Sequence, residues 1–208
     1  PCREEMPLLS ALAREQQAAG KDVLLVERFD RVGDGTRRMQ VSALTVMGAN
    51  PDSARGTTSY PALAQKVRES FTDPDATLKE LFTRVVVNVI VRNTDDHARN
   101  QAAFWDGTRL SLTPAYDINP SIGRRDSVAS HPMAITQDGD NRSLLEVCER
   151  AHSVFHLTRV ESKEIIHRAV DIVRSEWQEV AEAARLTETE RAALWEKSIL
   201  NPAIFWDA

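Results

Sequence analysis

Apolar residues in the middle of the chain follow a helical pattern on two faces. One face of the segment from Leu78 to about Arg92 carries Leu78, Leu81, Phe82, Val85 and Val89, and the other carries Val86, Val87 and Ile90. Thr77 and Glu80 have the spacing of a capping box, which predicts the start of this helix. A helix that is apolar on both faces is one buried inside a lobe.

Further segments show helical periodicity or helix-start signals. Helices are predicted over residues 3–19, 39–47, from 60 onward, 141–152, 159–177 and 188–198. Pro61 after Ser59 and Tyr60 fits the first turn of a helix. Thr158 with Glu161, and Thr187 with Glu190, are capping boxes for the last two.

Two stretches predict strands. A continuous apolar run bounded by charge indicates a buried strand from Val23 to Glu27. Residues 101–112 contain two short apolar pieces joined by Asp106-Gly107, a strong hairpin signal. Residues 121–142 are rich in turn formers and predict a loop. Together these elements predict an α+β fold that is mostly helical.

Composition narrows the class of protein. The 208 residues are 42% hydrophobic and 27% charged, an ordinary globular balance. The net charge is -5 and arginines are spread among acids, which argues against direct binding of nucleic acid. The longest apolar run, Val85 to Val91, is too short to span a membrane, and no signal peptide is evident, so we expect a cytoplasmic protein.

Two polar clusters flank the predicted hairpin. NTDDHARN (93–100) follows the central helix, and PAYDINP (114–120) follows the hairpin, so we expect Asp95, Asn100 and Asp117 to meet at one edge. Oxygen ligands of this kind suit Mg²⁺. Protein kinases use an aspartate, an asparagine five residues later and an aspartate beyond a short hairpin for phosphoryl transfer, although neither H-R-D nor D-F-G occurs here.

Four segments resemble the C-terminal part of HipA-type serine/threonine kinases, the toxins of bacterial toxin–antitoxin modules. They are LLVERFDR (24–31), RGTTSYPALAQKVRES (55–70), RVVVNVIVRNTDDHARN (84–100) and LSLTPAYDINPS (110–121). The resemblance implies a protein-kinase-like C-lobe with a hinge strand and a small catalytic hairpin. Residues 1–30 would then hold a partial N-terminal helix and the hinge strand, and residues 31–208 the helical C-lobe.

The resemblance also assigns roles to residues. Asp95 matches the catalytic aspartate of the family's D-x-H-x-x-N signature, and His97 matches its histidine, which we expect to fix the loop. Asn100 and Asp117 match the two Mg²⁺ ligands. Glu27 and Phe29 fall on the segment whose backbone binds the adenine edge of ATP.

Partners follow from the same resemblance. The family's partner is a helix-turn-helix antitoxin that binds operator DNA, and its substrates include an aminoacyl-tRNA synthetase. The cofactors implied are ATP and Mg²⁺, and no membrane is implied.

Departures from the family pattern keep other functions open. Family members are about twice as long, and we find no glycine-rich loop or phosphate-binding lysine; Lys21 lies too close to the hinge strand. The chain could therefore be a truncated or degenerate lobe that binds an antitoxin without catalysis. A third hypothesis is a metal-dependent phosphohydrolase with Asp95, Asp96 and His97 as ligands.

Some residues have simpler interpretations. We expect Asp96 to be solvated. His131, in SHPMAI, lies at a position that resembles a family motif, but no mechanism follows from it.

Overall fold

A computed structural model describes residues 14–18, 21–25, 28–50 and 57–206, in two units, residues 1–40 and 41–208. In the first unit, β1 (Arg14–Ala18) and β2 (Lys21–Leu25) pair antiparallel. The predicted helix over 3–19 is wrong where β1 lies, because pairing with β2 satisfies the backbone and overrides local periodicity; its other residues lie outside those described. The strand predicted from Val23 is confirmed as far as Leu25, and Glu27 lies outside the described residues.

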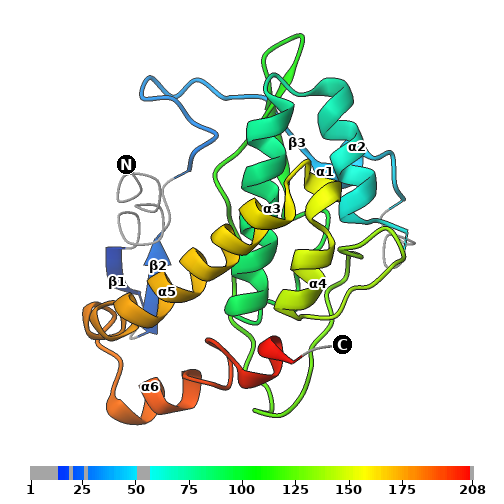
Figure 1. Cartoon of the computed structure of the whole chain (residues 1–208). Coiled ribbons are helices and arrows are strands. Elements are labelled where there is room, and N and C mark those ends of the chain that lie inside the picture. Colours follow the sequence, from blue (N-terminus) through cyan, green and yellow to red (C-terminus); the bar gives the residue numbers. More distant parts are fainter. Residues whose placement is uncertain (1–13, 19–20, 26–27, 51–56, 207–208) are drawn as a thin grey trace. The chain divides into compact units, whose positions relative to one another are not determined.

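The second unit is built around α3 (Pro74–Ile90), which Figure 1 shows in green at the centre. Four elements pack against it: α2 (Tyr60–Ser70), α4 (Leu145–Arg150), the 3-10 helix η2 (His152–Phe155) and α5 (Arg159–Ala183). The α3 side chains with no exposed surface are Leu78, Leu81, Phe82, Val85, Val86, Val89 and Ile90. The prediction of a central helix buried on both faces is therefore confirmed, although Val87 on the second face is only partly buried.

The start of α3 differs from the prediction. Its N-cap is Asp73, whose carboxylate accepts a hydrogen bond from the Ala76 backbone N–H, and Pro74 occupies the first turn. Aspartate at the N-cap followed by proline is a strong start signal, so the helix begins a turn before Thr77. Glu80, predicted to cap the helix, instead forms an ion pair with Arg84 at 2.8 Å.

The other helix starts follow local capping chemistry. Ser59 caps α2, and Thr158 and Thr187 cap α5 and α6 (Glu188–Leu194) with the predicted capping boxes. The helix ends differ: α5 continues to Ala183, α6 stops at Leu194, and α4 begins only at Leu145. A last 3-10 helix, η3, covers Pro202–Phe205.

A small sheet in the order β3-β4-β5 carries the hairpin. β4 (Ala102–Trp105) and β5 (Leu110–Leu112) pair antiparallel, and Gly107 in their connection has φ +106°, a conformation that favours glycine. The predicted hairpin is confirmed. Residues 39–47, predicted as one helix, contain β3 (Gln40–Ser42) followed by the four-residue α1 (Ala43–Val46), because the backbone of β3 pairs with the sheet.

The observed fold is α+β and mostly helical, as the sequence predicts. Residues 121–142 contain no helix or strand in this described region, also as predicted. The division at residues 30 and 31 stays a prediction. Among the described helices, none is both long and apolar enough to cross a membrane.

Candidate active site

The loop that follows α3, residues 93–100, folds into a tight turn around the backbone of Asp95. The Asp95 carbonyl accepts hydrogen bonds from the His97 backbone N–H at 2.9 Å and from Asn100 Nδ2 at 3.2 Å. The His97 carbonyl in turn accepts from the Asn100 backbone N–H at 2.8 Å. The turn thus brings together Asp95, His97 and Asn100, the three site residues predicted from the D-x-H-x-x-N signature.

Asn93 connects this loop to Asp117. Its buried Nδ2 donates to Asn88 Oδ1 on α3 at 3.0 Å and to the Asp117 carbonyl at 3.4 Å. Its Oδ1 accepts from the Asp95 backbone N–H at 3.2 Å. One asparagine therefore links the central helix, the 93–100 loop and the segment after the hairpin. This role was not predicted from the sequence, although an asparagine three residues after a helix was a visible signal.

Asp117 itself has a left-handed backbone conformation and an exposed side chain. Its φ is +57°, which aspartate tolerates better than most residues. The neighbouring Tyr116 hydroxyl donates to the Arg99 carbonyl at 2.5 Å, which ties this segment to the 93–100 loop. Burial, and secondarily the charge of Asp117, raises the pKa of Tyr116, so the phenol stays protonated. The three residues predicted to converge are thus joined in one hydrogen-bonded network.

The two carboxylates of this network, those of Asp95 and Asp117, are exposed, whereas Asn100 is buried, with 7% of its surface exposed. The Asp95 side chain is 68% exposed, and His97 Nε2 lies 4.0 Å from its Oδ2. Within the described residues, neither the Asp117 carboxylate nor Asn100 Oδ1 has a hydrogen-bond partner. One carboxylate and one amide oxygen, with water and phosphate supplying the rest, is a donor set that fits Mg²⁺.

Asp96 points the other way, and the expectation that it is solvated is wrong. It is 1% exposed, and its carboxylate accepts hydrogen bonds from the Tyr60 hydroxyl at 2.5 Å and from Gln101 Nε2 at 3.2 Å. The tight turn places adjacent side chains on opposite sides of the loop, and a buried carboxylate requires such donors. Burial, with Asp96 beside it, raises the pKa of Tyr60 well above its usual value.

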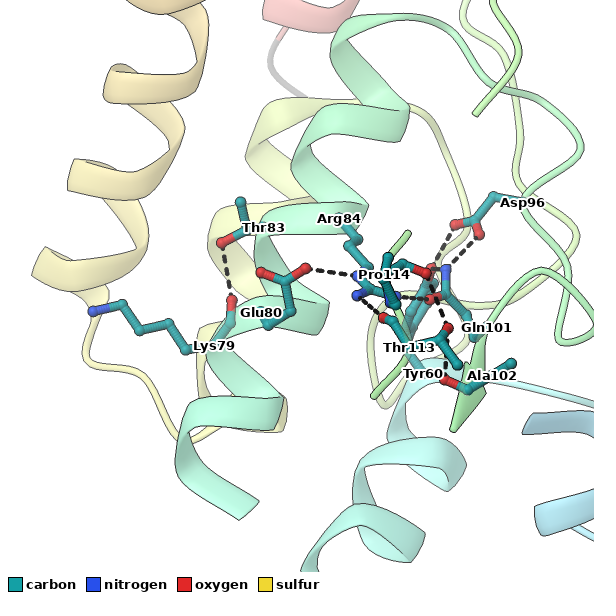
Figure 2. A network of polar contacts seen from close by, with 10 residues as sticks. All are labelled: Tyr60, Lys79, Glu80, Thr83, Arg84, Asp96, Gln101, Ala102, Thr113 and Pro114. Carbon is teal, nitrogen blue, oxygen red and sulfur yellow. Dashed lines mark hydrogen bonds and ion pairs between the residues drawn. The ribbon is translucent and has the colours of Figure 1, made fainter. Parts of the chain in front are cut away.

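A buried arginine extends this network behind the loop (Figure 2). Arg84 pairs with Glu80 and donates through Nη1 to Gln101 Oε1 at 3.3 Å and through Nη2 to the Thr113 carbonyl at 2.6 Å. Gln101 follows the 93–100 loop, and Thr113 follows the hairpin. The network therefore fixes both segments to α3.

These geometries contradict the ligand set of the phosphohydrolase hypothesis. The Asp96 carboxylate is turned toward Tyr60, away from the exposed Asp95. In the described part of the chain, no group of three or more histidine, cysteine or acidic side chains is placed to hold a metal ion. Asp95, Asp96 and His97 do not form one site.

One buried histidine, His131, and one partly buried histidine, His97, lie in this part of the structure. His131 is 3% exposed, and neither ring nitrogen has a hydrogen-bond partner among the described residues. Burial lowers its pKa, opposed by the charge of Asp96, so the neutral imidazole is favoured. His97 Nδ1 is also buried. Both lie among supporting residues, and the geometry gives His131 no catalytic role.

The structure does not test the two residues predicted to bind adenine. Glu27 is outside the described residues, and Phe29 belongs to the first unit, where it is partly buried. Their role stays a prediction.

Comparisons with known proteins agree with this architecture. A family model described as the HipA-like C-terminal domain matches residues 6–177. No curated protein matches the chain. A solved structure titled as the Shewanella oneidensis MR-1 toxin–antitoxin system HipA, HipB and its operator DNA complex is similar in fold, with a TM-score of 0.70 and 18% identity. The match covers 95% of this chain and 54% of that chain, so this chain spans about half the length of the protein it resembles. Because the family model matches most of its residues, the chain belongs to the family of HipA-like C-terminal domains.

Proposed function

We propose that this chain is the catalytic lobe of a HipA-type serine/threonine kinase, the toxin of a toxin–antitoxin system. The observation that carries the proposal is the outward face of the site. Asp95 and Asp117 present carboxylates that accept no hydrogen bond from the described residues, on segments that Asn93 and the Arg84 network hold in place. Free functional groups on a fixed backbone are what a preorganised site requires.

The proposed reaction transfers the γ-phosphoryl group of ATP to a protein hydroxyl. Asp95 orients the hydroxyl and takes its proton as the oxygen–phosphorus bond forms and the bond to the β–γ bridging oxygen breaks, releasing ADP. Asn100 Oδ1 and the Asp117 carboxylate are the groups that would hold Mg²⁺. The ion, when bound, neutralises charge on the phosphates.

The hydrogen bonds inside the loop suit these roles. Asn100 uses its Nδ2 on the Asp95 carbonyl, which turns the amide oxygen toward a ligand. His97 lies 4.0 Å from the Asp95 carboxylate, near enough to orient it without occupying it. Because the loop backbone is already bonded, substrate binding does not have to order it.

Partners and substrates of the whole protein are also proposals. The Shewanella structure contains HipB and operator DNA beside HipA, which supports a helix-turn-helix antitoxin as partner. The operator DNA in that structure weighs against the expectation that the chain binds no nucleic acid directly. An aminoacyl-tRNA synthetase as substrate rests on the family resemblance alone. Copurification of the full-length gene product with a helix-turn-helix protein encoded beside it tests the partner.

The test of the site is calorimetric titration of the 208-residue chain with ATP, with and without Mg²⁺, alongside two variants. Asp117→Ala removes a proposed metal ligand. Asp171→Ala removes the same charge from an exposed position on α5 and serves as the matched control. We expect Mg²⁺-dependent binding that Asp117→Ala abolishes and Asp171→Ala leaves unchanged.

Other outcomes would contradict the proposed site or favour a function without catalysis. Equal binding by the parent chain and Asp117→Ala would contradict the assigned metal site. A folded chain that binds no nucleotide but copurifies with an antitoxin would favour the non-catalytic binding module.

A further inference from the structure

Arg92, directly after α3, is a buried arginine without an acidic partner. It is 8% exposed, yet among the described residues no carboxylate forms an ion pair with it. Its pKa is lowered by burial alone. Arg84, within α3, is buried to a similar degree but pairs with Glu80. A buried cation normally has an anion beside it, so Arg92 lacks the partner that its environment favours.

The guanidinium of Arg92 is aimed at Ser127. Nη1 donates to the Ser127 carbonyl at 2.9 Å, and Nη2 donates to the Ser127 hydroxyl at 3.1 Å. Gly123 supplies the surface on which it lies, because a Cβ at position 123 would be only 2.2 Å from Arg92 Nε. Only glycine permits that approach. The glycine therefore leaves room for the planar group in the orientation that faces the serine.

The loop around Ser127 is accessible and basic. Arg124, Arg125 and Asp126 are exposed, and Ser127 itself is partly exposed. Arg125 pairs with Glu196 at 2.6 Å, whereas Arg124 has no ion pair within the described part of the chain. Arg124 is thus a second cation three residues before Ser127, and the Ser127 hydroxyl donates a hydrogen bond to its backbone carbonyl at 3.1 Å.

We propose that Ser127 is a phosphorylation site and that its phosphoryl group is bound by the guanidinium of Arg92. The group is transferred from ATP by a serine kinase: the Ser127 oxygen bonds to the γ-phosphorus, the bond to the β–γ bridging oxygen breaks, ADP leaves, and the hydroxyl proton passes to the base of that kinase. Any ATP-dependent serine kinase supplies this step, so the inference goes beyond the function proposed above.

The site accommodates the modification at small cost. A phosphoryl group offers three strong acceptor oxygens and pairs with a guanidinium fork better than a neutral hydroxyl does. The Arg124 carbonyl would lose the hydroxyl donor, but it still accepts from Asn201 Nδ2 at 3.1 Å and from the Ser127 backbone N–H at 3.3 Å. Arg92 would gain the anion that it lacks.

The modification would act on the candidate active site through Arg92. The Ser121 backbone N–H donates to the Arg92 carbonyl at 3.1 Å, and Thr94 and Ser121 share a hydrogen bond of 2.9 Å. Residues 118–127, which follow Asp117, are therefore bonded to Arg92 at Ser121 and at Ser127. A stronger bond at Ser127 would restrict this segment and with it the position of Asp117.

The first experiment incorporates phosphoserine at position 127 and, as a matched control, at the exposed Ser130 of the same loop. Titration followed by ³¹P NMR reports the second pKa of each phosphate. We expect the phosphate at 127 to titrate about one pH unit lower than that at 130, because a nearby cation favours the more charged form. Thermal unfolding should show a Tm rise of roughly 2–4 °C for 127 only.

Two variants separate recognition by Arg92 from a general effect of charge. Arg92→Met should bring the two phosphates to the same pKa. Gly123→Ala keeps every charge and displaces the guanidinium, so it should shrink the difference at least threefold even if Arg92→Met does not fold. Equal pKa values at 127 and 130 in the parent chain would overturn the proposed recognition.

The second experiment asks whether the modification occurs. Phosphopeptide mapping is applied to the full-length gene product from its native cells, lysed with phosphatase inhibitors, and to the same protein after incubation with ATP and Mg²⁺. We expect phosphate on Ser127 in at least one sample. Complete coverage of the peptide without phosphate in both samples overturns the proposal, whatever the calorimetry shows of the nucleotide site.

Discussion

Asp95 and Asp96 are neighbours in the chain and opposites in the structure. The Asp95 side chain is 68% exposed and accepts no hydrogen bond from the described residues, whereas Asp96 is 1% exposed and accepts bonds from Tyr60 and Gln101. One is exposed, as the proposed base requires, and the other anchors the loop to Tyr60 of α2 and to Gln101, directly before the hairpin. Of these two aspartates, Asp95 is thus available for the proposed chemistry and Asp96 stabilises the loop.

The largest expected effect is that of Asp95→Ala on catalysis. Removing the proposed base should lower phosphoryl transfer by roughly 10²–10⁴-fold, while the free energy of unfolding changes by no more than about 0.5 kcal/mol. Transfer from labelled ATP is measured on the full-length gene product, and urea unfolding on the same samples. A variant that keeps its activity would remove Asp95 from the mechanism.

Asp96→Ala should give the reverse result. Its loss leaves the Tyr60 hydroxyl and Gln101 Nε2 buried without their acceptor, which should lower the free energy of unfolding by about 2–3 kcal/mol. Urea unfolding of this variant beside Asp95→Ala measures the contrast directly. Equal stability of the two variants would show that burial does not distinguish these aspartates.

Tyr60→Phe removes the hydroxyl that donates to Asp96, and its effect on stability should depend on pH. The loss of one hydrogen bond to a carboxylate should cost about 1.5–3 kcal/mol at pH 7. Because burial raises the folded-state pKa of Tyr60, its phenol contributes stability that is complete below the unfolded pKa, about 10, and is lost as the pH rises through the folded value.

Unfolding measured between pH 8 and about 11 checks this sign. The parent chain should lose stability above about pH 10, and Tyr60→Phe should lose less of it. Cys148, whose pKa burial raises to about 12, is present in both chains and serves as the internal control. Parallel pH curves for the two proteins would contradict the role assigned to Tyr60.

Substitution of Asp140 should have the smallest of these expected effects. Unlike Asp95 and Asp96, this aspartate forms ion pairs with arginines. Its hydrogen bonds to Arg142 foremost, and its pairing with Arg150, lower its pKa to about 2. Since both arginines are well exposed, Asp140→Asn should cost only about 0.2–1 kcal/mol at pH 7. A lowered pKa means that this stability is present above pH 4 and disappears as the pH falls through about 2, so the two proteins should converge there. If Asp140→Asn lowered the free energy of unfolding at pH 7 more than Asp96→Ala does, the hydrogen bonds of Asp96 would not be the stronger ones.

The sequence predicts those features that depend on neighbours along the chain. The caps at Ser59, Thr158 and Thr187 are confirmed because each satisfies the first turn of its own helix. The hairpin at Asp106-Gly107 is confirmed because its turn needs a residue with positive φ. The predicted helix over 3–19 is wrong at β1, since its backbone pairs with another strand.

The same distinction between local and distant contacts applies to the residues of the candidate site. Motif spacing and the family resemblance were enough to select Asp95, His97, Asn100 and Asp117 as candidates, because spacing within a turn is a property of the chain. They did not select Asn93 or Arg92, whose partners lie 24 and 35 positions away. Nor did they give the direction of Asp96, which depends on a tyrosine 36 positions earlier.

By itself, the sequence determined the class of fold, the buried central helix, the turn chemistry and the set of polar residues after the helix, since periodicity, capping and spacing are local. Which of those polar groups face outward depends on contacts between distant parts of the chain. Packing brings distant donors such as Tyr60 and Gln101 to one carboxylate and leaves the next one exposed. A buried charge must find its partners in space, and the order of residues does not specify them.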